Sequence, residues 1–378
     1  MFDVAVVGAG PAGATAALHL ARQGLKVAIL EKARLPRYKT CGGGVVPRGL
    51  RLLPPDVATV IERECTSAEL HLLDADLHFT ATRAQPIIAM TMRDKLDFLL
   101  TRRAAAAGAE VISPCRVTAV TSENRHAQLE TERGPMTAGF VIAADGATGE
   151  VARRAGFQDG RHLTPALEYE ITVDDATWSR HAGAARFDVG VVPHGYGWVF
   201  PKASHLSVGV LSSRRGKIDL HRHLAEYLRT LGLAPRSGER HGFVIPVRPR
   251  RGPFVRGRVL LAGDAAGFTD PVTGEGISFA VASGAMAADV IAQCGLDERR
   301  IRGAYHDALS RAILPELRIG RGLARLLYDH PRLRTLLFRR AGQPLVEAIT
   351  DVFMGVRTYR ASLAGLLRRL ALLPVTRS

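Results

Sequence analysis

Apolar runs separated by turn-forming residues open the chain. Residues 4–7 form a short apolar run that predicts a buried strand, residues 11–23 predict a helix with proline in its first turn, and residues 26–30 predict a second strand. A helix between two buried strands makes the strands parallel neighbours. The chain therefore begins with a βαβ unit.

The hydrophobic pattern changes twice further along the chain. Residues 94–107 predict a helix that ends at Gly108, and residues 140–144 predict a short strand that runs into the turn DGATG. Between about residues 166 and 210, segments such as LEYEITV and HLSVGVL alternate with turns, which favours an antiparallel sheet. Residues 258–268 return to a strand and a glycine turn, and a helical stretch then reaches about Cys294.

Length and composition limit the class of protein. The chain has 378 residues, 47% of them hydrophobic, so we expect at least two interleaved domains with large cores. The best apolar stretch, residues 277–288, stops at Asp289, short of the ~18 residues that suggest a membrane span. No basic segment precedes the first strand, which favours a cytoplasmic protein over a secreted one. The cysteines are far apart and predict reduced thiols without a metal site; they are Cys41, Cys65, Cys115 and Cys294.

Positive charge is concentrated at the C-terminal end. The chain carries a net charge of +15, and residues 299–378 hold sixteen arginines against five acidic residues, which is +11 of that total. Leucines recur among these arginines at helical spacing and predict amphipathic helices; they are Leu323, Leu326, Leu327, Leu333, Leu336 and Leu337. Such helices suit peripheral contact with an anionic membrane, or packing against protein. Nucleic-acid binding is not expected, because the arginines alternate with leucines and not with aromatic residues.

The glycine-rich turn after the first strand predicts a dinucleotide site. Gly8, Gly10 and Gly13 supply a tight turn, close approach of the backbone to a pyrophosphate, and close helix packing. Glu31 ends the second strand, where a carboxylate accepts hydrogen bonds from ribose hydroxyls and repels a 2′-phosphate. NADP is therefore a poor occupant of this site, and NAD or FAD remain.

A downstream segment, LAGDAAGFTDPVTGEGISFAVASGAMAA, favours FAD. It places Gly263 and Asp264 at the end of a strand, followed by a loop and a helix that begins near Gly274. An aspartate at this point suits a ribityl chain, and the helix N-terminus suits the pyrimidine edge of a flavin, where it stabilises negative charge. A plain dehydrogenase has no use for such a segment.

These motifs resemble known flavoproteins. GAGPAG, MRDKLDFLL, AADGATGEVAR and LAGDAAG occur in the order seen in the superfamily that includes para-hydroxybenzoate hydroxylase, over about residues 1–295. Within this superfamily, RYKTCGGGVVPRGL, GYGWVFPK and DPVTGEGI resemble the geranylgeranyl reductase family, whose members saturate double bonds of prenyl chains in lipids or pigments.

The resemblance implies the fold and its domains. We expect an α/β protein (α+β overall) with a Rossmann-like FAD-binding domain in three pieces, residues 1–73, 90–160 and 240–295. An antiparallel substrate domain, residues 74–89 and 161–239, interrupts it. A helical region, residues 296–378, follows.

The resemblance also implies roles for particular residues. The ADP half of FAD is expected at the glycine turn and Glu31, the phosphates or ribityl chain at Arg93, the ribityl and pyrophosphate region at Gly263 and Asp264, and the isoalloxazine at Gly274 and Gly276. The full set of expected FAD residues is Gly8, Gly10, Pro11, Ala12, Gly13, Glu31, Lys32, Cys41, Gly42, Arg93, Asp145, Gly263, Asp264, Gly274, Gly276 and Ile277.

The expected reaction needs a proton donor, because an isolated alkene has no carbonyl to stabilise the carbanion that hydride attack would create. Cys41, beside three glycines, and Tyr196, in GYGWVFPK, are the two candidates for this catalytic role. Tyr196, Trp198 and Phe200 alternate along one strand face and suit a prenyl chain, although core packing produces the same pattern.

Two further points stay open at the level of sequence. With one βαβ unit visible, NAD(P)H would dock transiently as electron donor, and a ferredoxin-type donor is equally compatible. The alternative function is an FAD-dependent monooxygenase that hydroxylates an aromatic or polyketide-like substrate. A halogenase is disfavoured, since GYGWVFP stands where the resemblance would require W-x-W-x-I-P.

Overall fold

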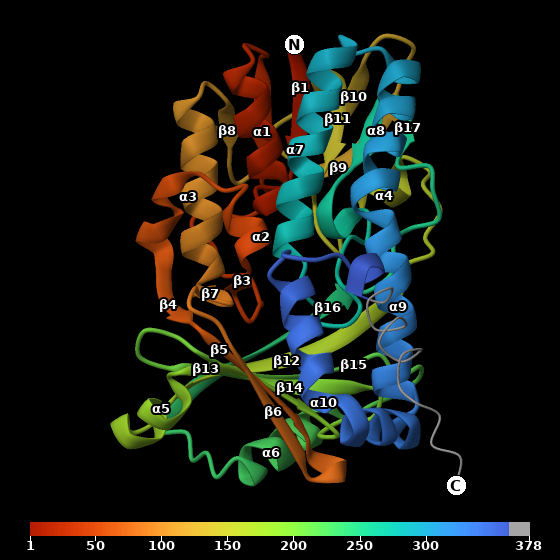
Figure 1. The fold of residues 1–378 in the computed structure, drawn as a ribbon. Helices are drawn as coiled ribbons and strands as arrows, with labels where there is room; N and C mark the ends of the chain where they lie inside the picture. Colours follow the sequence, from red (N-terminus) through yellow and green to blue (C-terminus); the bar gives the residue numbers. More distant parts are fainter. Residues whose placement is uncertain (363–378) are drawn as a thin grey trace, which may run out of the picture.

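The computed structural model describes residues 1–362. Figure 1 shows a layered α/β body in the upper half of the view and an antiparallel sheet lying across the lower half. Helices from the C-terminal part of the chain run down one side and reach both halves (Figure 1).

The α/β body is built on a parallel sheet. Its strands follow the order β17 (Val255–Arg256), β18 (Val259–Leu261), β11 (Met136–Ala143), β1 (Phe2–Val7), β2 (Val27–Leu30) and β8 (Glu110–Ile112). The five strands from β18 to β8 are parallel, and β10 (Ala127–Thr131) and β9 (Val117–Ser122) add an antiparallel extension to β11. The predicted βαβ unit is confirmed, because β1 and β2 pair in parallel across α1 (Pro11–Arg22).

Helices pack tightly on this sheet. Three further helices pack on the sheet together with α1, and these are α3 (Arg93–Ala106), α7 (Ile277–Cys294) and α8 (Glu298–Ala312). A side chain at Gly284 of α7 would place its Cβ 2.2 Å from the carbonyl oxygen of Ala12, so the absence of a side chain lets α1 and α7 touch. Among the described residues, α7 is the one helix long and apolar enough to cross a membrane, but most of it is buried between its neighbours.

A small three-stranded sheet joins the two halves. It consists of β3 (Gly44–Val45), β7 (Ile88–Thr91) and β4 (Ile61–Cys65), flanked by α2 (Pro47–Leu50) and the 3-10 helix η1 (Pro55–Val60). The short helix α4 (Val151–Arg154) follows β11 on the other side of the body.

The lower sheet has seven strands. Their order is β16 (Ser237–Pro246), β12 (Leu163–Thr172), β15 (Leu206–Ser212), β14 (Gly195–Pro201), β13 (Ala184–Val189), β5 (Ser67–Leu72) and β6 (Leu77–Thr82). All neighbours are antiparallel except β13 and β5. The sheet therefore takes residues 67–72 and 240–246 from segments that the sequence placed in the FAD-binding domain, and residues 88–89 belong instead to the small sheet.

Both faces of the lower sheet are covered. The helix α6 (Leu220–Thr230) packs an apolar cluster against its outer face, with α5 (Asp175–His181) beside it. The inner face turns toward the α/β body and the C-terminal helices. In the central strands β14 and β15, the side chains on both faces are therefore buried.

The C-terminal helices divide their contacts between the two halves. Tyr305 of α8 donates a hydrogen bond to the Leu261 carbonyl, so this helix belongs to the α/β core, beyond the expected boundary at residue 295. The helices α9 (Leu314–Asp329) and α10 (Pro331–Phe353) pack on the lower sheet. As predicted they are amphipathic, with Leu327 buried and Leu333 and Leu336 exposed. Residues 363–378, which include Arg368, Arg369 and Arg377, lie outside the described part of the chain.

Candidate active site

A cavity of about 620 Å³ lies between the carboxyl ends of the parallel strands and the inner face of the seven-stranded sheet. Most residues expected at the site line it. They are Gly8, Gly10, Pro11, Ala12, Glu31, Lys32, Cys41, Gly42, Arg93, Asp145, Asp264, Gly274, Gly276 and Ile277, with Tyr196, Trp198 and Phe200. The structure thus brings together in one cavity residues that are up to about 270 positions apart in the chain.

Two expected residues are not part of the cavity lining. A Cβ at Gly13 would lie 2.0 Å from the Gly8 carbonyl oxygen, and one at Gly263 would lie 3.0 Å from the Ala12 Cβ. Both glycines pack α1 against its neighbours and shape the cavity from behind. The expected contact of Gly263 with the ribityl and pyrophosphate region stays a prediction.

The end of the cavity near α1 has the geometry of a dinucleotide site. Gly8 has a φ of +102°, a conformation that favours glycine, and a Cβ there would lie 2.4 Å from the Ala144 carbonyl oxygen. Gly10 faces open space, since the nearest atom to its Cβ position is an Arg93 guanidinium nitrogen at 3.8 Å. The α1 N-terminus is thereby exposed to a ligand.

Glu31 is held at the end of β2 by backbone donors. Its carboxylate accepts hydrogen bonds from the N–H groups of Ala9 (2.9 Å) and Ala33 (3.0 Å), and Arg37 lies 3.5 Å away. These contacts fix the carboxylate at the position where a ribose is expected.

Arg93 lies between the glycine turn and the cysteine loop, residues 37–44. Asp97 accepts hydrogen bonds from its guanidinium at 2.8 and 2.9 Å. Burial lowers the pKa of Arg93, but Asp97 and the adjacent Cys41 thiol raise it more, so the pKa lies above its ordinary value. Arg93 is a permanent cation midway along the cavity.

The far end of the cavity is formed by the segment after β18. Asp264 lies in the 3-10 helix η3 (Gly263–Ala265), and burial raises the pKa of its carboxyl despite the nearby Lys39 and Arg93. Gly276 precedes α7, and a Cβ at this glycine would lie 3.4 Å from the Asp264 carboxylate. The N-termini of α1 and α7 both face the cavity, as the sequence predicted for FAD.

The three glycines after Cys41 allow their loop to lie against the lower sheet. A Cβ at Gly42 would lie 2.9 Å from the Phe200 ring, and one at Gly43 would lie 1.9 Å from the Thr91 carbonyl oxygen. The Lys202 ammonium donates hydrogen bonds to the carbonyls of Gly42 (2.7 Å) and Thr91 (3.0 Å). Lys202 is fully buried and burial lowers its pKa, so it serves as an internal clamp for the loop.

The aromatic residues of β14 form one wall of the cavity. The ring of Trp198 lies over Gly209, where a Cβ would be 2.1 Å from the indole. The Tyr196 hydroxyl donates its hydrogen bond to the Thr273 carbonyl, and burial raises its pKa. Tyr196 is therefore well placed as a wall residue, and its proton is engaged elsewhere.

An acidic side of the cavity was not found from the sequence. Glu168 of β12 lies on the same sheet face as Trp198 and is buried. Its Oε1 accepts hydrogen bonds from the Tyr38 hydroxyl (2.7 Å) and from the backbone N–H of Cys41 (3.0 Å). Burial and the adjacent Glu170 raise the pKa of Glu168 to about 7. The alternation in LEYEITV placed the two glutamates on one face, but nothing in it showed that this face is covered.

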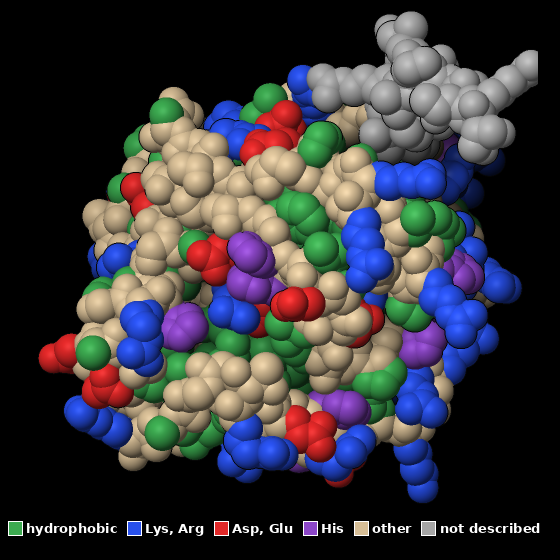
Figure 2. Space-filling model, turned by 60° about the horizontal axis from the view of Figure 1, so that its bottom comes forward, with side chains coloured by type: hydrophobic (Ala, Val, Ile, Leu, Met, Phe, Trp, Pro, Cys, Tyr) green, Lys and Arg blue, Asp and Glu red, His purple; other side chains and the backbone are tan. Residues whose placement is uncertain are grey.

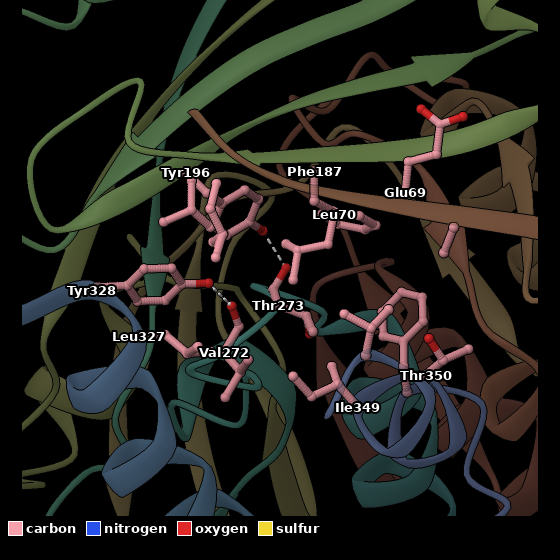
Figure 3. A pocket seen from close by; sticks show the side chains of 15 residues that line it. Glu69, Leu70, Phe187, Tyr196, Val272, Thr273, Leu327, Tyr328, Ile349 and Thr350 are labelled. Atoms are coloured by element: carbon pink, nitrogen blue, oxygen red, sulfur yellow. Dashed lines mark hydrogen bonds between the residues drawn. The ribbon is translucent and has the colours of Figure 1, made fainter. Parts of the chain in front are cut away.

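A second, smaller cavity of about 70 Å³ continues from the aromatic wall. Figure 3 shows Leu327 and Tyr328 of α9 and Ile349 of α10 converging on it, opposite Phe187 and Tyr196 of the sheet. Phe187, Tyr196, Thr273 and Phe353 line both cavities. The Glu69 carboxylate points away from the apolar centre (Figure 3). The C-terminal helices thus close an apolar recess that adjoins the main cavity.

Comparisons with known proteins agree with this site. The FAD binding domain family matches residues 1–295. Digeranylgeranylglycerophospholipid reductase 2 of Methanothermobacter thermautotrophicus is 33% identical over 351 residues, which cover 86% of each chain. The chloroplastic geranylgeranyl diphosphate reductase of Arabidopsis thaliana is 30% identical over 92% of this chain and 79% of its own. The chain belongs to the geranylgeranyl reductase family. The resemblance first noted in its motifs is confirmed.

Solved structures show the same fold. A geranylgeranyl bacteriochlorophyll reductase-like protein of Thermoplasma acidophilum superposes with a TM-score of 0.78 and 24% identity, over 98% of this chain and 96% of its own. A flavin-dependent brominase superposes with a TM-score of 0.75 and 20% identity, over 97% and 99% of the two chains. This member of the geranylgeranyl reductase family therefore has a fold that reductases and halogenating enzymes share.

The cofactor of the family fits the cavity. Gly10 leaves a cradle in front of the α1 N-terminus that a side chain would fill. The buried Oδ1 of Asp145 has no hydrogen-bond partner within residues 1–362, although this residue lines the cavity. The protein binds FAD, with the α1 end of the cavity suited to the ADP half and the α7 end suited to the flavin.

Proposed function

We propose that this protein reduces carbon–carbon double bonds of a prenyl chain. The observation that carries the proposal is the continuity of the flavin end of the cavity with an aromatic wall and an apolar recess. Tyr196, Trp198, Phe200 and Phe187 form the wall, and Leu327 and Val346 help to close the recess. Such surroundings suit a long hydrocarbon and offer few partners to a polar aromatic substrate. The names of the relatives support the same substrate class.

The residues of the chain would have two roles, which are to bind the prenyl chain and to supply a proton to the alkene. Bound reduced FAD supplies a hydride to the alkene. The aromatic wall holds the prenyl chain beside the flavin end and excludes water, while the Lys202 clamp fixes the cysteine loop against Phe200. Protonation of the alkene is the remaining requirement, because the double bond is not polarised.

Of the two proton donors proposed from the sequence, the contacts favour Cys41. Its thiol lies beside Arg93 and accepts a hydrogen bond from the Gly43 N–H at 3.4 Å. Tyr196 instead donates to the Thr273 carbonyl. If Cys41 supplies the proton, replacing it by alanine leaves FAD bound and slows alkene reduction in a single turnover. Equal rates for the variant and the parent would assign Cys41 a packing role.

We propose that the electron donor docks only transiently on the protein. NAD(P)H and a ferredoxin-type protein both remain candidates, and stopped-flow reduction of bound FAD by each would distinguish them. We infer a cytoplasmic protein that makes peripheral contact with the inner face of an anionic membrane.

Charge and exposure on α10 support that contact. Arg332, Leu333, Leu336, Arg339 and Arg340 are exposed along its first turns. On the face of the molecule in Figure 2, lysine and arginine side chains are frequent toward the right-hand edge and hydrophobic side chains lie between them. Each arginine near an anionic surface contributes about 1 kcal/mol.

The membrane contact is tested by cosedimentation with anionic and neutral vesicles across a salt series. Changing Arg339 and Arg340 to glutamine should weaken binding to anionic vesicles at low salt, whereas Arg116 and Arg133 of the α/β body provide a matched charge control. Equal binding of the two double variants would contradict a role for α10.

The reaction itself is tested anaerobically. Protein reduced with dithionite is incubated with a digeranylgeranyl glycerophospholipid or with geranylgeranyl diphosphate, and the products are analysed by mass spectrometry. The expected product is heavier by two hydrogen atoms for each reduced bond. If neither substrate is reduced, and a hydroxylated product forms from an aromatic substrate in air, the monooxygenase function replaces the proposal.

A further inference from the structure

Glu168 is a buried acid at the border between the aromatic wall and the cysteine loop. A single cross-strand row joins Phe187, Trp198, Gly209, Glu168 and His241 on the inner face of the lower sheet. Because a β-strand alternates its side chains between two faces, in-register neighbours point the same way. The carboxyl of Glu168 therefore lies on the sheet face that carries Trp198, and both residues line the cavity.

The hydrogen bonds of this carboxyl leave one oxygen for a proton. Tyr38 and the Cys41 backbone both donate to Oε1. No hydrogen bond to Oε2 occurs within residues 1–362, and this oxygen is not among the fully enclosed atoms without a partner. A neutral carboxyl whose Oε1 accepts two hydrogen bonds is free to direct an O–H on Oε2 into the cavity.

Tyr38 connects this carboxyl to solvent. The side chain of Tyr38 is 41% exposed, whereas that of Glu168 is buried. A phenol hydroxyl both donates and accepts, so it can pass a proton to the carboxylate and take one from water. The site thus has a route for replacing the proton after each turnover.

We propose that Glu168, in place of Cys41 or Tyr196, is the acid that protonates the prenyl double bond, with Tyr38 returning the proton from solvent. This inference rests on the proposed reductase function. The new C–H bond forms at the less substituted alkene carbon, using the π electron pair and the proton of Glu168. The other carbon accepts the hydride from reduced FAD, so that the flavin is oxidised by two electrons and Glu168 is left as a carboxylate. A proton from water then reaches Oε1 through the Tyr38 hydroxyl, and a half-turn of the carboxyl group brings this proton to the side that faces the cavity.

The groups around Glu168 set the pH range in which it carries a proton. Glu170, two residues away on the same face, disfavours a negative charge on Glu168. The Oε2 atom of Glu170 lies 3.0 Å from the Nε2 atom of His205. Lys202 favours the carboxylate, as do the hydrogen bonds from Tyr38 and Cys41. His241 is the register partner from β16, and its ring lies 4.1 Å from that of Tyr38 between centroids, with the two planes tilted by 33°. Burial outweighs the favourable contacts, consistent with a neutral acid near pH 7.

The test compares single turnovers of reduced, FAD-loaded Glu168→Gln and parent protein with geranylgeranyl diphosphate under anaerobic conditions. Glutamine keeps the shape and the accepting oxygen but carries no acidic proton. We expect product formation to slow by about 100-fold or more. In the parent, the rate should fall as pH rises through about 7, and this decline should be absent in the variant. Oxidation of the reduced flavin by ferricyanide requires no alkene proton and should proceed at the parent rate.

Each outcome decides the proposal. A parent-like rate and pH profile in Glu168→Gln overturns the proposal, and so does loss of the pH-dependent decline in Cys41→Ala. If the glutamine variant does not retain FAD, Glu170→Gln decides: removing this like charge should move the midpoint of the pH profile to lower pH, and an unmoved midpoint overturns the proposal. Failure of the proposed function is distinct, since the parent protein itself would then form no saturated product.

Discussion

The raised pKa of Glu168 predicts a pH-dependent stability that can be measured without any substrate. Folding raises this pKa from 4.5 to about 7. Between these values the folded state binds more protons than the unfolded state, so the free energy of unfolding falls as pH rises through this window. Each pKa unit corresponds to about 1.4 kcal/mol, and the whole shift to about 3 kcal/mol. The contribution of Glu168 to the free energy of unfolding is fully present below pH 4.5 and is lost above about pH 7.

Glu168→Gln removes this titration and should therefore gain stability relative to the parent as pH rises. Urea unfolding of both FAD-loaded proteins from pH 5 to pH 8 should show the difference in unfolding free energy changing by about 2 to 3 kcal/mol in favour of the variant. The Glu170→Gln protein is the matched control. Without the like charge the pKa of Glu168 falls, so its stability should decline less steeply than that of the parent. Parallel curves for parent and Glu168→Gln would refute a raised pKa at this site.

Three further predictions concern the cavity walls. Lys202→Met removes the donor from two carbonyls, at a cost of about 1–3 kcal/mol each. The variant should therefore bind FAD more weakly in a fluorescence titration. Unchanged affinity would show that the loop of Gly42 does not need the Lys202 hydrogen bonds. Gly209→Val forces the indole of Trp198 to move, because a Cβ there lies 2.1 Å from it; alkene reduction should fall while FAD occupancy stays near that of the parent, and loss of FAD instead would place the indole at the cofactor. Gly10→Val should lower FAD occupancy after purification by filling the cradle at the α1 N-terminus, and full occupancy would contradict that placement.

The parts of the fold that the sequence predicted are those with local causes. The turn at Gly8 needs a positive φ, α1 starts at a proline, and β1 and β2 are continuous apolar runs, so each signal lies within a few residues of the element it describes. The residues of the cavity lining followed for the same reason, since the chain reaches the cavity at strand ends that carry their own glycines and acids. Contact of these residues with FAD, that of Gly263 included, stays a prediction.

The parts that the sequence did not predict depend on contacts between distant segments. β5 joins the lower sheet by pairing in parallel with β13, more than 110 residues later, and no local pattern specifies that partner. From the sequence alone, Lys202 is interpreted as a loop lysine, whereas in the fold its ammonium donates hydrogen bonds to two carbonyls. Likewise, the apolar recess exists only where α9 and α10 meet Phe187 and Tyr196.

The cross-strand row through Trp198 and Glu168 links these long-range contacts to the proposed chemistry. Gly209 stands between the two residues, and its missing side chain leaves room for the indole over the sheet. On one side of Trp198 the row continues to Phe187 and the apolar recess, which suits the hydrocarbon chain. On the other side it ends at the acid and its exit to solvent through Tyr38. A double bond held over this boundary would have hydrocarbon contacts along its chain and a proton at one end, whereas a bond buried deeper in the recess would meet no acid. The row therefore gives a physical reason why the bond to be reduced must lie at the edge of the aromatic wall.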